Sequence, residues 1–241
     1  MTGPADEVEV VRCDTVVTIR LNRPAKRNAI TGAMYTRLAD ALTEAGDATV
    51  VLLTGAGGAF TAGNDLRDMV ENPVLGDDAP PLRFLAALTE LRAVLLAAVD
   101  GPALGVGTTV LLHCDLVYAT ADSVFGFPFV DLGLVPEAAS TLLLPQLTGH
   151  QRAAELMLLA ERFGAARAAE LGLVTEVVAD AEELSTRLAQ RTAELLAKPR
   201  AALLATKALL RESGARTVPE RLRMDSRALR ELIREKTNVA G

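Results

Sequence analysis

The stretch Leu53-Thr-Gly-Ala-Gly-Gly-Ala-Phe-Thr-Ala-Gly-Asn-Asp-Leu66 carries most of the information about the fold of this 241-residue chain. It follows the short apolar run Val50–Leu53, which is typical of a buried strand, and it places glycines where a turn leads into a helix. The stretch Gly101-Pro-Ala-Leu-Gly-Val-Gly-Thr108 follows the apolar run Ala93–Val99 in the same way. Such turns expose unpaired backbone N–H groups that can bind negative charge, although a plain tight turn explains any single one of them as well.

Strand and helix patterns extend from these stretches in both directions. We expect strands over Val16–Leu21, Val50–Leu53, Leu96–Val99, Leu116–Thr120 and Val174–Val178, and helices over Ala33–Ala45, Phe84–Leu95, Val106–Leu112, Ala138–Leu147, Gln151–Leu159, Ala165–Leu171, Ala181–Ala197, Pro199–Arg211 and Pro219–Arg234. Asn72–Pro81 holds three Pro, one Gly and two Asp, which predicts a mobile loop. The pattern therefore predicts an α/β core over residues 1–180, followed by a helical region over residues 181–241.

The composition excludes several classes of protein. With 50% apolar and 23% charged residues the chain is expected to be globular, and a net charge of -6 with no Trp and two Tyr argues against a nucleic-acid partner. Cys13 and Cys114 are isolated, so neither a disulfide framework nor a metal site is indicated. Reduced thiols, no basic apolar leader and an apolar stretch that is interrupted at residues 100–102 predict a cytoplasmic protein without a membrane span.

Glu137 is the candidate catalytic residue, within Phe125-Gly-Phe-Pro-Phe-Val-Asp-Leu-Gly-Leu-Val-Pro-Glu137-Ala-Ala-Ser140. It follows Pro136 at the start of a predicted apolar helix, with three Phe just upstream. It is either a first-turn acid that complements the helix dipole or a desolvated general base. The helix N-terminus would lower its pKa and the apolar surroundings would raise it, and the sequence does not decide between these effects.

Five segments, taken together, resemble the crotonase superfamily of enoyl-CoA hydratases and isomerases. They are residues 21–30, 53–66, 98–107, 125–140 and 169–178, in the order of the family. The resemblance implies a spiral of repeated ββα units with a helical C-terminal region for trimerisation. It also implies an acyl-CoA thioester substrate, no metal or other cofactor beyond the CoA of the substrate, and a homotrimer or a dimer of trimers.

The same resemblance assigns roles to residues of the glycine-containing stretches. The main-chain N–H groups of Asn64 and Val106 would form an oxyanion hole for a thioester enolate. Val106 stands where the family usually has Gly, so the donor is kept while the pocket is expected to narrow. The residues implied to contact the substrate or its CoA moiety are Lys26, Ala62, Gly63, Asn64, Asp65, Leu66, Gly105 and Phe129.

The positions at which this chain has or lacks a glutamate of the family indicate which reaction to expect. By resemblance, the two glutamates of the hydratases align with Thr109 and Phe129, whereas Glu137 aligns with the single glutamate of the peroxisomal-type Δ3,Δ2-enoyl-CoA isomerases. We therefore expect an isomerase of fatty-acid metabolism in which one carboxylate moves a proton from C2 to C4. The alternatives are a residual hydratase, a hydrolase or dehalogenase-like enzyme with Glu137 as nucleophile, and a non-catalytic acyl-CoA-binding homologue.

Three other features of the sequence have a plain structural explanation. Thr109 and His113 are four residues apart on one predicted helix, as in a hydroxyl–base pair, but a core histidine on an apolar helix is commoner. Asp131 lies in a turn and is expected to order the backbone. Val110 stands where a dinucleotide fingerprint needs a small residue, so a nicotinamide cofactor is not expected.

Overall fold

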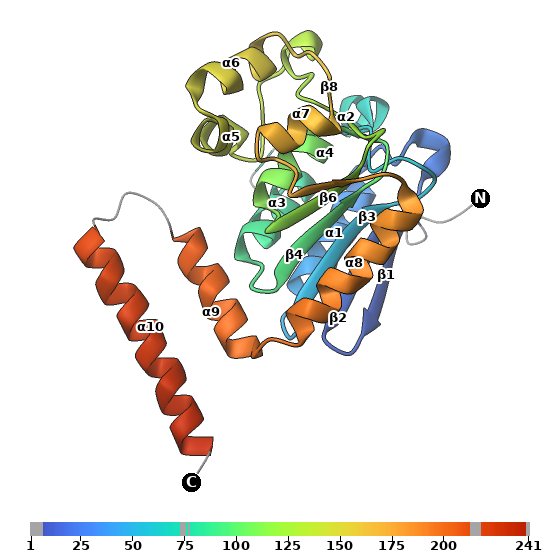
Figure 1. The fold of residues 1–241 in the computed structure, drawn as a ribbon. Helices are drawn as coiled ribbons and strands as arrows, with labels where there is room; N and C mark the ends of the chain where they lie inside the picture. The colour runs from blue at the N-terminus through green and yellow to red at the C-terminus, as the bar shows by residue number, and fades with distance from the viewer. Residues whose placement is uncertain (1–6, 73–75, 77, 213–217, 240–241) are drawn as a thin grey trace.

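A six-stranded sheet with the strand order β1-β2-β3-β4-β6-β9 lies at the centre of the computed structural model, which describes residues 7–72, 76, 78–212 and 218–239 (Figure 1). The first two strands form an antiparallel hairpin, and every later pair of neighbours is parallel. Parallel neighbours need crossovers, so helices separate these strands along the chain. The strands are β1 (Val8–Cys13), β2 (Val16–Leu21), β3 (Val50–Gly55), β4 (Val94–Val99), β6 (Leu116–Thr120) and β9 (Glu176–Val178).

Helices cover both faces of this sheet, and strand β4 shows the consequence. All six of its residues are buried, as expected for a strand with an apolar layer on each side. Leu95 and Ala97 belong to the core cluster that includes α1 and α3, whereas Leu96 and Ala98 belong to the cluster that includes α8. The side chains of one apolar run therefore alternate between two cores. The covering helices are α1 (Gly32–Thr43), α3 (Pro80–Glu90) and α8 (Ala181–Leu196).

A three-stranded sheet of order β5-β7-β8 and a helical cap lie at one end of the main sheet (Figure 1). The chain turns at Asp100 and Gly101, so β5 follows β4 directly in the sequence but pairs in the second sheet. The cap has its own apolar cluster, which includes Phe127, Phe129 and Leu144. The elements of this end are α2 (Leu66–Glu71), β5 (Pro102–Leu104), α4 (Val106–Thr109), η3 (Val110–His113), β7 (Val124–Gly126), η4 (Val130–Leu132), α5 (Ser140–Thr148), α6 (His150–Leu158), β8 (Phe163–Gly164) and α7 (Ala165–Glu170).

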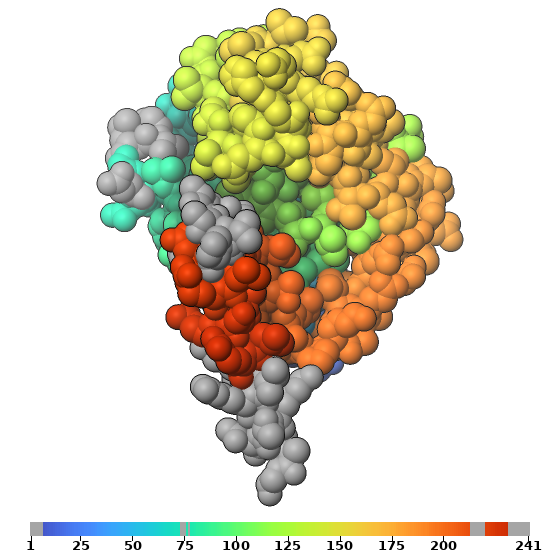
Figure 2. All heavy atoms as spheres, turned by 60° about the vertical axis from the view of Figure 1, so that its left-hand side comes forward, coloured from blue at the N-terminus to red at the C-terminus, as the bar shows by residue number. Residues whose placement is uncertain are grey.

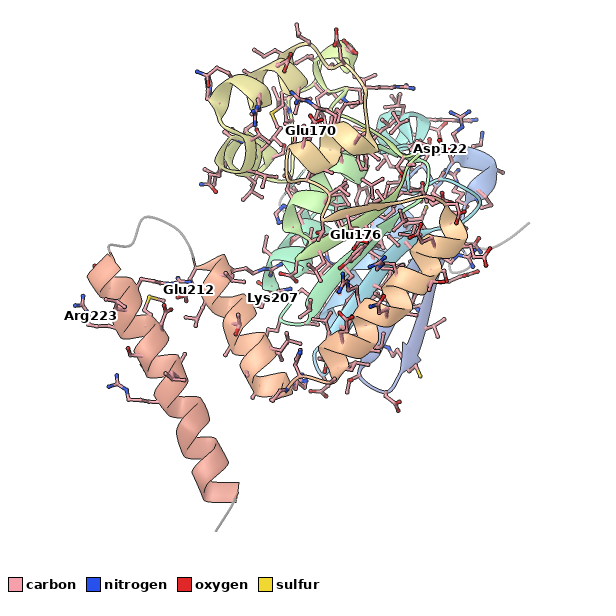
Figure 3. All side chains as sticks on the ribbon, in the orientation of Figure 1. Asp122, Glu170, Glu176, Lys207, Glu212 and Arg223 are labelled. Carbon is pink, nitrogen blue, oxygen red and sulfur yellow. The ribbon has the colours of Figure 1, made fainter. Side chains whose placement is uncertain are left out.

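The chain continues into two helices, α9 (Arg200–Arg211) and α10 (Val218–Val239). Lys207 lies on α9 (Figure 3). It anchors this helix, because its ammonium group donates to the Asp115 carboxylate at 2.6 Å and to the carbonyl of Ala93. Helix α10 lies beside α9 and away from the sheet, and both helices form part of the face shown in Figure 2. Leu222 and Leu229 of α10 are exposed, so this helix presents apolar side chains to its surroundings. No helix in the described part of the chain is long and apolar enough to span a membrane.

The predicted α/β core and the helical C-terminal part are confirmed, with corrections to several boundaries. The expected helix Phe84–Leu95 is instead α3, which ends at Glu90, and the expected strand Leu96–Val99 begins earlier, at Val94. A continuous apolar run fits both the helical and the strand periodicity, so the boundary between the helix and the strand could not be located from the pattern. Of the expected loop Asn72–Pro81, residues 73–75 and 77 lie outside the described part, and the final two prolines open α3, where the missing N–H groups cost nothing.

Other elements differ in type or were not predicted. The expected helix Val106–Leu112 consists of one α-helical turn, α4, followed by the 3-10 turn η3, and the expected helix Ala138–Leu147 begins only at Ser140. The short strands β5, β7 and β8 were missed, since two or three residues carry too little pattern. The first strand, β1, was also missed, although it has six residues. The division into residues 1–180 and 181–241 stays a prediction; α8 packs directly on the main sheet through Leu184.

Candidate active site

Two backbone segments, residues 61–64 and 102–106, run side by side where the main sheet meets the cap. The Thr61 N–H donates to the Pro102 carbonyl, and the Leu104 N–H donates to the Thr61 carbonyl, both at 3.0 Å. Gly63 has φ 98°, and a Cβ there would lie 2.9 Å from the Leu104 carbonyl oxygen. Only glycine fits this close approach without a shift of the backbone. The two glycine-containing stretches of the sequence therefore form one backbone unit.

This unit carries two unpaired main-chain donors. Among the described residues, neither the N–H of Asn64 nor that of Val106 donates a hydrogen bond. Val106 opens α4, and the first N–H groups of a helix have no partner within it. On either side of Asn64 the pairing is complete, since the Ile30 N–H donates to Gly63 O and the Asp65 N–H donates to Ile30 O. Two such donors can hold one oxygen that develops negative charge.

A cavity of about 740 Å³ opens beside Asn64. Its walls are mainly apolar and come from α1, α2, the start of α3 and the segment between η4 and α5. The lining residues are Ile30, Gly32, Tyr35, Asn64, Asp68, Met69, Asn72, Ala79, Pro80, Pro81, Leu82, Phe129, Leu134, Val135 and Glu137. The predicted residues Asn64, Phe129 and Glu137 are thus brought together around one space, whose size and lining suit an acyl chain.

Glu137 lies on a turn before α5 rather than in the first turn of a helix. Ala138 and Ala139 both have left-handed backbone conformations, with φ 56° and 53°, and α5 begins after them at Ser140. Ser140 closes the turn, because its N–H and its hydroxyl both donate to the Glu137 carbonyl, at 3.0 and 2.6 Å. The side chain of Glu137 is therefore placed by a short turn whose conformation the predicted helix did not include.

Burial decides the protonation behaviour of this carboxyl group. Oε1 of Glu137 is buried and has no hydrogen-bond partner among the described residues, although the residue as a whole is half-buried. Desolvation raises the pKa of Glu137 to about 7, so of the two opposing effects considered from the sequence the apolar surroundings prevail. At neutral pH both protonation states are populated, which suits a group that accepts a proton and returns it.

Tyr35 of α1 was missed by the sequence analysis. Its ring is buried against Phe84, with centroids 5.6 Å apart, and its hydroxyl donates to Oδ1 of Asn64. Burial, and secondarily the nearby charge of Glu137, raises the pKa of Tyr35 well above its usual value, so it stays protonated. A tyrosine among the apolar positions of a helix needs a partner for its hydroxyl, and this requirement was the only signal available in the sequence.

The residues aligned with the hydratase glutamates cannot act as acids here. Thr109 is fully buried and its hydroxyl donates to the Val106 carbonyl at 3.3 Å, while Phe129 is part of the cavity wall. Asp68 also lines the cavity, but its two oxygens accept hydrogen bonds from the Gly32 N–H at 2.7 Å and from the Asn72 side chain at 3.0 Å. Among the described acids that line the cavity, Glu137 alone has an oxygen without a partner.

The alternative hydroxyl–base pair is not formed. Thr109 donates to its own helix, and Nε2 of His113 lies 2.8 Å from the carbonyl of Ala138. The side chain of Val106 is also elsewhere than expected, because it is buried in the core near Leu38 and does not line the large cavity. The side chain of Val106 is therefore not part of the wall of this cavity.

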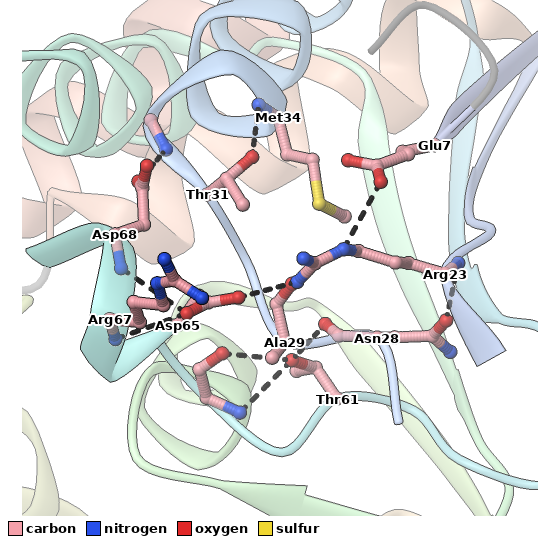
Figure 4. A network of polar contacts seen from close by, with 12 residues as sticks. Glu7, Arg23, Asn28, Ala29, Thr31, Met34, Thr61, Asp65, Arg67 and Asp68 are labelled. Atoms are coloured by element: carbon pink, nitrogen blue, oxygen red, sulfur yellow. Dashed lines mark hydrogen bonds and ion pairs between the residues drawn. The ribbon is translucent and has the colours of Figure 1, made fainter. Parts of the chain in front are cut away.

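Two of the residues implied to contact CoA, Asp65 and Ala62, also make contacts that support the backbone unit. Asp65 caps α2 and forms an ion pair with Arg23 at 2.7 Å, and this hydrogen bond is the main reason why the pKa of Asp65 is lowered (Figure 4). Arg23 also bonds Glu7 at 3.1 Å. Lys26 and Leu66 are exposed, and the N–H of Ala62 donates at 2.9 Å to the carbonyl of residue 27, next to Lys26.

Asn28 is a further organising residue that the sequence did not reveal. It is fully buried with φ 56°, and its side-chain nitrogen donates to Ala56 O at 2.9 Å and to Ala59 O at 2.7 Å. Its main-chain carbonyl accepts the hydroxyl of Thr61 at 2.7 Å (Figure 4). Asn28 therefore ties the turn after β3 to the segment that leads to Asn64. Asparagine tolerates the left-handed conformation better than most residues, which explains its use here.

The described residues contain no group of three or more His, Cys, Asp and Glu side chains that could hold a metal ion. Both cysteines are free thiols, Cys13 on the surface and Cys114 partly buried. Burial raises the pKa of Cys114 far above its usual value, so this thiol stays protonated. Neither cysteine lines the large cavity.

Comparison with known proteins gives one consistent result. The profile of the enoyl-CoA hydratase/isomerase family matches residues 12–241. The mouse protein named enoyl-CoA delta isomerase 3, peroxisomal, is 34% identical over 156 residues, which are 61% of this chain and 49% of the mouse protein. The 2,3-dehydroadipyl-CoA hydratase of Escherichia coli strain K12 is 38% identical over 154 residues, which are 61% of this chain and 60% of that protein. The matched part thus spans between about half and three fifths of the length of these curated relatives.

Among solved structures, a Thermobifida fusca protein in complex with acetoacetyl-CoA shares the fold over almost the whole length. The TM-score is 0.87 and the identity 32%, covering 96% of this chain and 96% of that one.

Proposed function

The chain belongs to the enoyl-CoA hydratase/isomerase family and has the crotonase fold, and on this premise we propose that it is a Δ3,Δ2-enoyl-CoA isomerase of fatty-acid metabolism. The observation that carries the proposal is the carboxyl group of Glu137, which alone among the described cavity-lining acids has an oxygen without a partner. Isomerisation needs one group that both accepts and returns a proton. The pKa of about 7 gives Glu137 both capacities at neutral pH.

The reaction then proceeds in two proton transfers. The substrate thioester oxygen accepts hydrogen bonds from the main-chain N–H groups of Asn64 and Val106, and Glu137 removes a proton from C2. The electron pair of the broken C–H bond spreads over a dienolate that extends from the thioester oxygen to C4. Glu137 returns its proton at C4, the double bond moves from C3–C4 to C2–C3, and the carboxylate is regenerated.

Hydration would need a second acid–base group beside Glu137. Adding water across C2–C3 requires a group that activates the water and a group that delivers a proton at the neighbouring carbon. The two positions that carry these acids in the hydratases are Thr109, whose hydroxyl is engaged, and Phe129, which is apolar. We therefore assign the carboxyl group of Glu137 to isomerisation, although relatives of both activities match the chain.

The rest of the proposal concerns the substrate and the assembly. The acyl chain occupies the cavity of about 740 Å³, and the CoA moiety lies along Ala62–Leu66 with Lys26 near its phosphates. The reaction uses no metal and no cofactor other than the CoA of the substrate. The enzyme acts in the cytoplasm as a homotrimer or a dimer of trimers, in which the exposed leucines of α10 are covered by other subunits.

A panel of 3-enoyl-CoA and trans-2-enoyl-CoA esters of increasing chain length tests the assignment. We expect 3-enoyl-CoA to be converted to trans-2-enoyl-CoA, and trans-2-enoyl-CoA to give no 3-hydroxyacyl-CoA at a comparable rate. Hydration as the faster reaction would replace the proposal by the hydratase alternative. Binding of the esters without turnover on any of them would indicate a non-catalytic homologue.

Mass spectrometry of enzyme quenched during turnover separates the proton shuttle from nucleophilic catalysis. A shuttle leaves the mass of the peptide containing Glu137 unchanged, whereas a nucleophile leaves an acyl adduct on this residue. An adduct that forms and decays at the turnover rate would contradict the proposed mechanism.

A further inference from the structure

The turn that carries Glu137 needs support from outside itself. Ala138 and Ala139 occupy consecutive left-handed conformations, which side chains with a Cβ adopt rarely. Ser140 closes the turn on the Glu137 carbonyl, but it leaves the carbonyl of Ala138 to another partner. A turn of this kind persists only where its surroundings hold it.

His113 supplies that partner from η3. Its Nε2 lies 2.8 Å from the Ala138 carbonyl oxygen, and no other described group donates to this oxygen. A carbonyl only accepts, so the hydrogen is on Nε2. Burial is the main reason why the pKa of His113 is lowered, which favours the neutral ring. His113 does not line the cavity, so it reaches the reaction only through the turn.

The C-terminal helix α9 contacts the backbone of His113 and supports its position. Arg211 donates to the carbonyl of His113 at 3.2 Å and to the carbonyl of Leu91 at 3.0 Å. One helical turn earlier, Lys207 is paired with Asp115 at 2.6 Å. Two cations of α9 therefore fix the segment on either side of residue 114. A continuous series of contacts runs from α9 through His113 to the turn of Glu137.

We propose that His113 is a positioning residue for Glu137: through its hydrogen bond to the Ala138 carbonyl it holds the left-handed turn so that the carboxyl group stays in the cavity. This inference rests on the proposed role of Glu137 as the base. The Thr109–His113 spacing therefore does not reflect a hydroxyl–base pair. His113 donates a hydrogen bond to the backbone of the turn that carries Glu137, and it takes no part in the proton transfers of the reaction.

The test compares His113→Leu with His113→Gln. Leucine removes the donor, so we expect kcat for 3-enoyl-CoA to fall by ~10- to 10²-fold while KM changes less than about threefold. Glutamine places an N–H near the position of Nε2, and we expect it to restore kcat to within about threefold of the parent. The chain has one other histidine, and His150→Gln on the exposed start of α6 is the matched control, with unchanged kcat.

A second readout does not depend on turnover. Difference infrared spectroscopy across a pH series, with Glu137→Gln as the reference, follows protonation of the Glu137 carboxyl group. If the turn loosens in His113→Leu, the carboxyl group gains water and its pKa falls from about 7 toward the usual value of glutamate. His113→Gln and His150→Gln should keep it near 7.

The outcomes separate this inference from the proposed function. If Glu137→Gln is inactive but His113→Leu keeps its kcat and the pKa of Glu137, the positioning role is wrong and the base assignment stands. A loss in His113→Leu that His113→Gln does not restore, in a folded protein, also contradicts the role. If Glu137→Gln keeps full activity, the proposed function fails, whatever the histidine variants show.

Discussion

The segments 61–64 and 102–106 are joined by main-chain hydrogen bonds, whereas the turn that carries Glu137 is held mainly by side chains. The first pair is joined by main-chain ladder contacts and a glycine close approach, with additional support from the Asn28 side chain and the Thr61 hydroxyl. The second relies on Ser140 and His113 around two left-handed alanines. We therefore expect substitutions of neighbouring side chains to displace the N–H donors of Asn64 and Val106 less than they displace the carboxyl group of Glu137.

The largest effect is expected for Glu137→Gln. Glutamine keeps the size and hydrogen-bonding capacity but cannot take up the C2 proton, so kcat should fall ~10²- to 10⁴-fold. Affinity for a CoA ester, measured by calorimetry, should change little because the loss lies in the chemical step. A comparable loss of affinity would indicate that Glu137 serves binding instead.

The next effect concerns the donor at Val106. Proline is tolerated at the first position of a helix but has no N–H, so Val106→Pro should lower kcat by ~10²- to 10³-fold in a protein that remains folded. Val106→Gly keeps the N–H and serves as the control; it should mainly lower stability, because the buried valine side chain is lost from the core. Equal kcat values for the two variants in steady-state kinetics would remove Val106 from the oxyanion hole.

The pH dependence of the rate should follow the raised pKa of Glu137. The base must be ionised to accept a proton, so kcat/KM should rise with pH through about 7 and level off above it. One pH unit below this value the rate should be about tenfold lower than the plateau, as for any single ionisation. A profile that is flat between pH 5 and 8 would show that the titrating group is not the base.

The same shift predicts a smaller effect on stability. The pKa of Glu137 is raised on folding, so its protonated form favours the folded state and stability decreases as pH rises from the usual value of about 4.5 to about 7. Glu137→Gln should therefore melt at a higher temperature than the parent at pH 8 and at nearly the same temperature at pH 4. Calorimetry at both pH values checks the sign, and an equal difference at both would rule out this linkage.

The smallest effect on the reaction is expected for Thr109→Ala. The hydroxyl donates to the Val106 carbonyl in a buried position, so its removal should cost about 1 kcal/mol of stability. It transfers no proton in the proposed mechanism, and kcat should stay within about threefold of the parent. Loss of isomerase activity in a folded Thr109→Ala protein would reopen a catalytic role for this residue.

The two regions also differ in how far the sequence predicts them. Glycines after apolar strands have a local physical meaning, so turns with unpaired N–H groups and the α/β class could be anticipated from the pattern. Asn64 and Val106 were named as donors only through the family resemblance. Glu137 was found through its apolar neighbours. The left-handed conformations of Ala138 and Ala139 could not be found, because alanine favours a helix and only contacts with distant residues impose the turn.

The remaining misses have the same origin. Tyr35 and Asn64 are 29 residues apart, and Arg23 and Asp65 are 42 residues apart, so neither contact leaves a local pattern. The proline pair that opens α3 lies in the segment for which the sequence predicts a loop, although proline is also favoured in the first turn of a helix. Local patterns thus predicted the elements, while the side chains that support the site became visible only with the tertiary structure.

The most direct test of the central claim uses 3-enoyl-CoA deuterated at C2. A single carboxyl group that carries the proton from C2 to C4 should yield trans-2-enoyl-CoA with part of the deuterium at C4, as detected by NMR and mass spectrometry of the product. Glu137→Gln should form neither the product nor the C4 label at a rate near that of the parent enzyme. Formation of labelled product by Glu137→Gln at the parental rate would contradict the account.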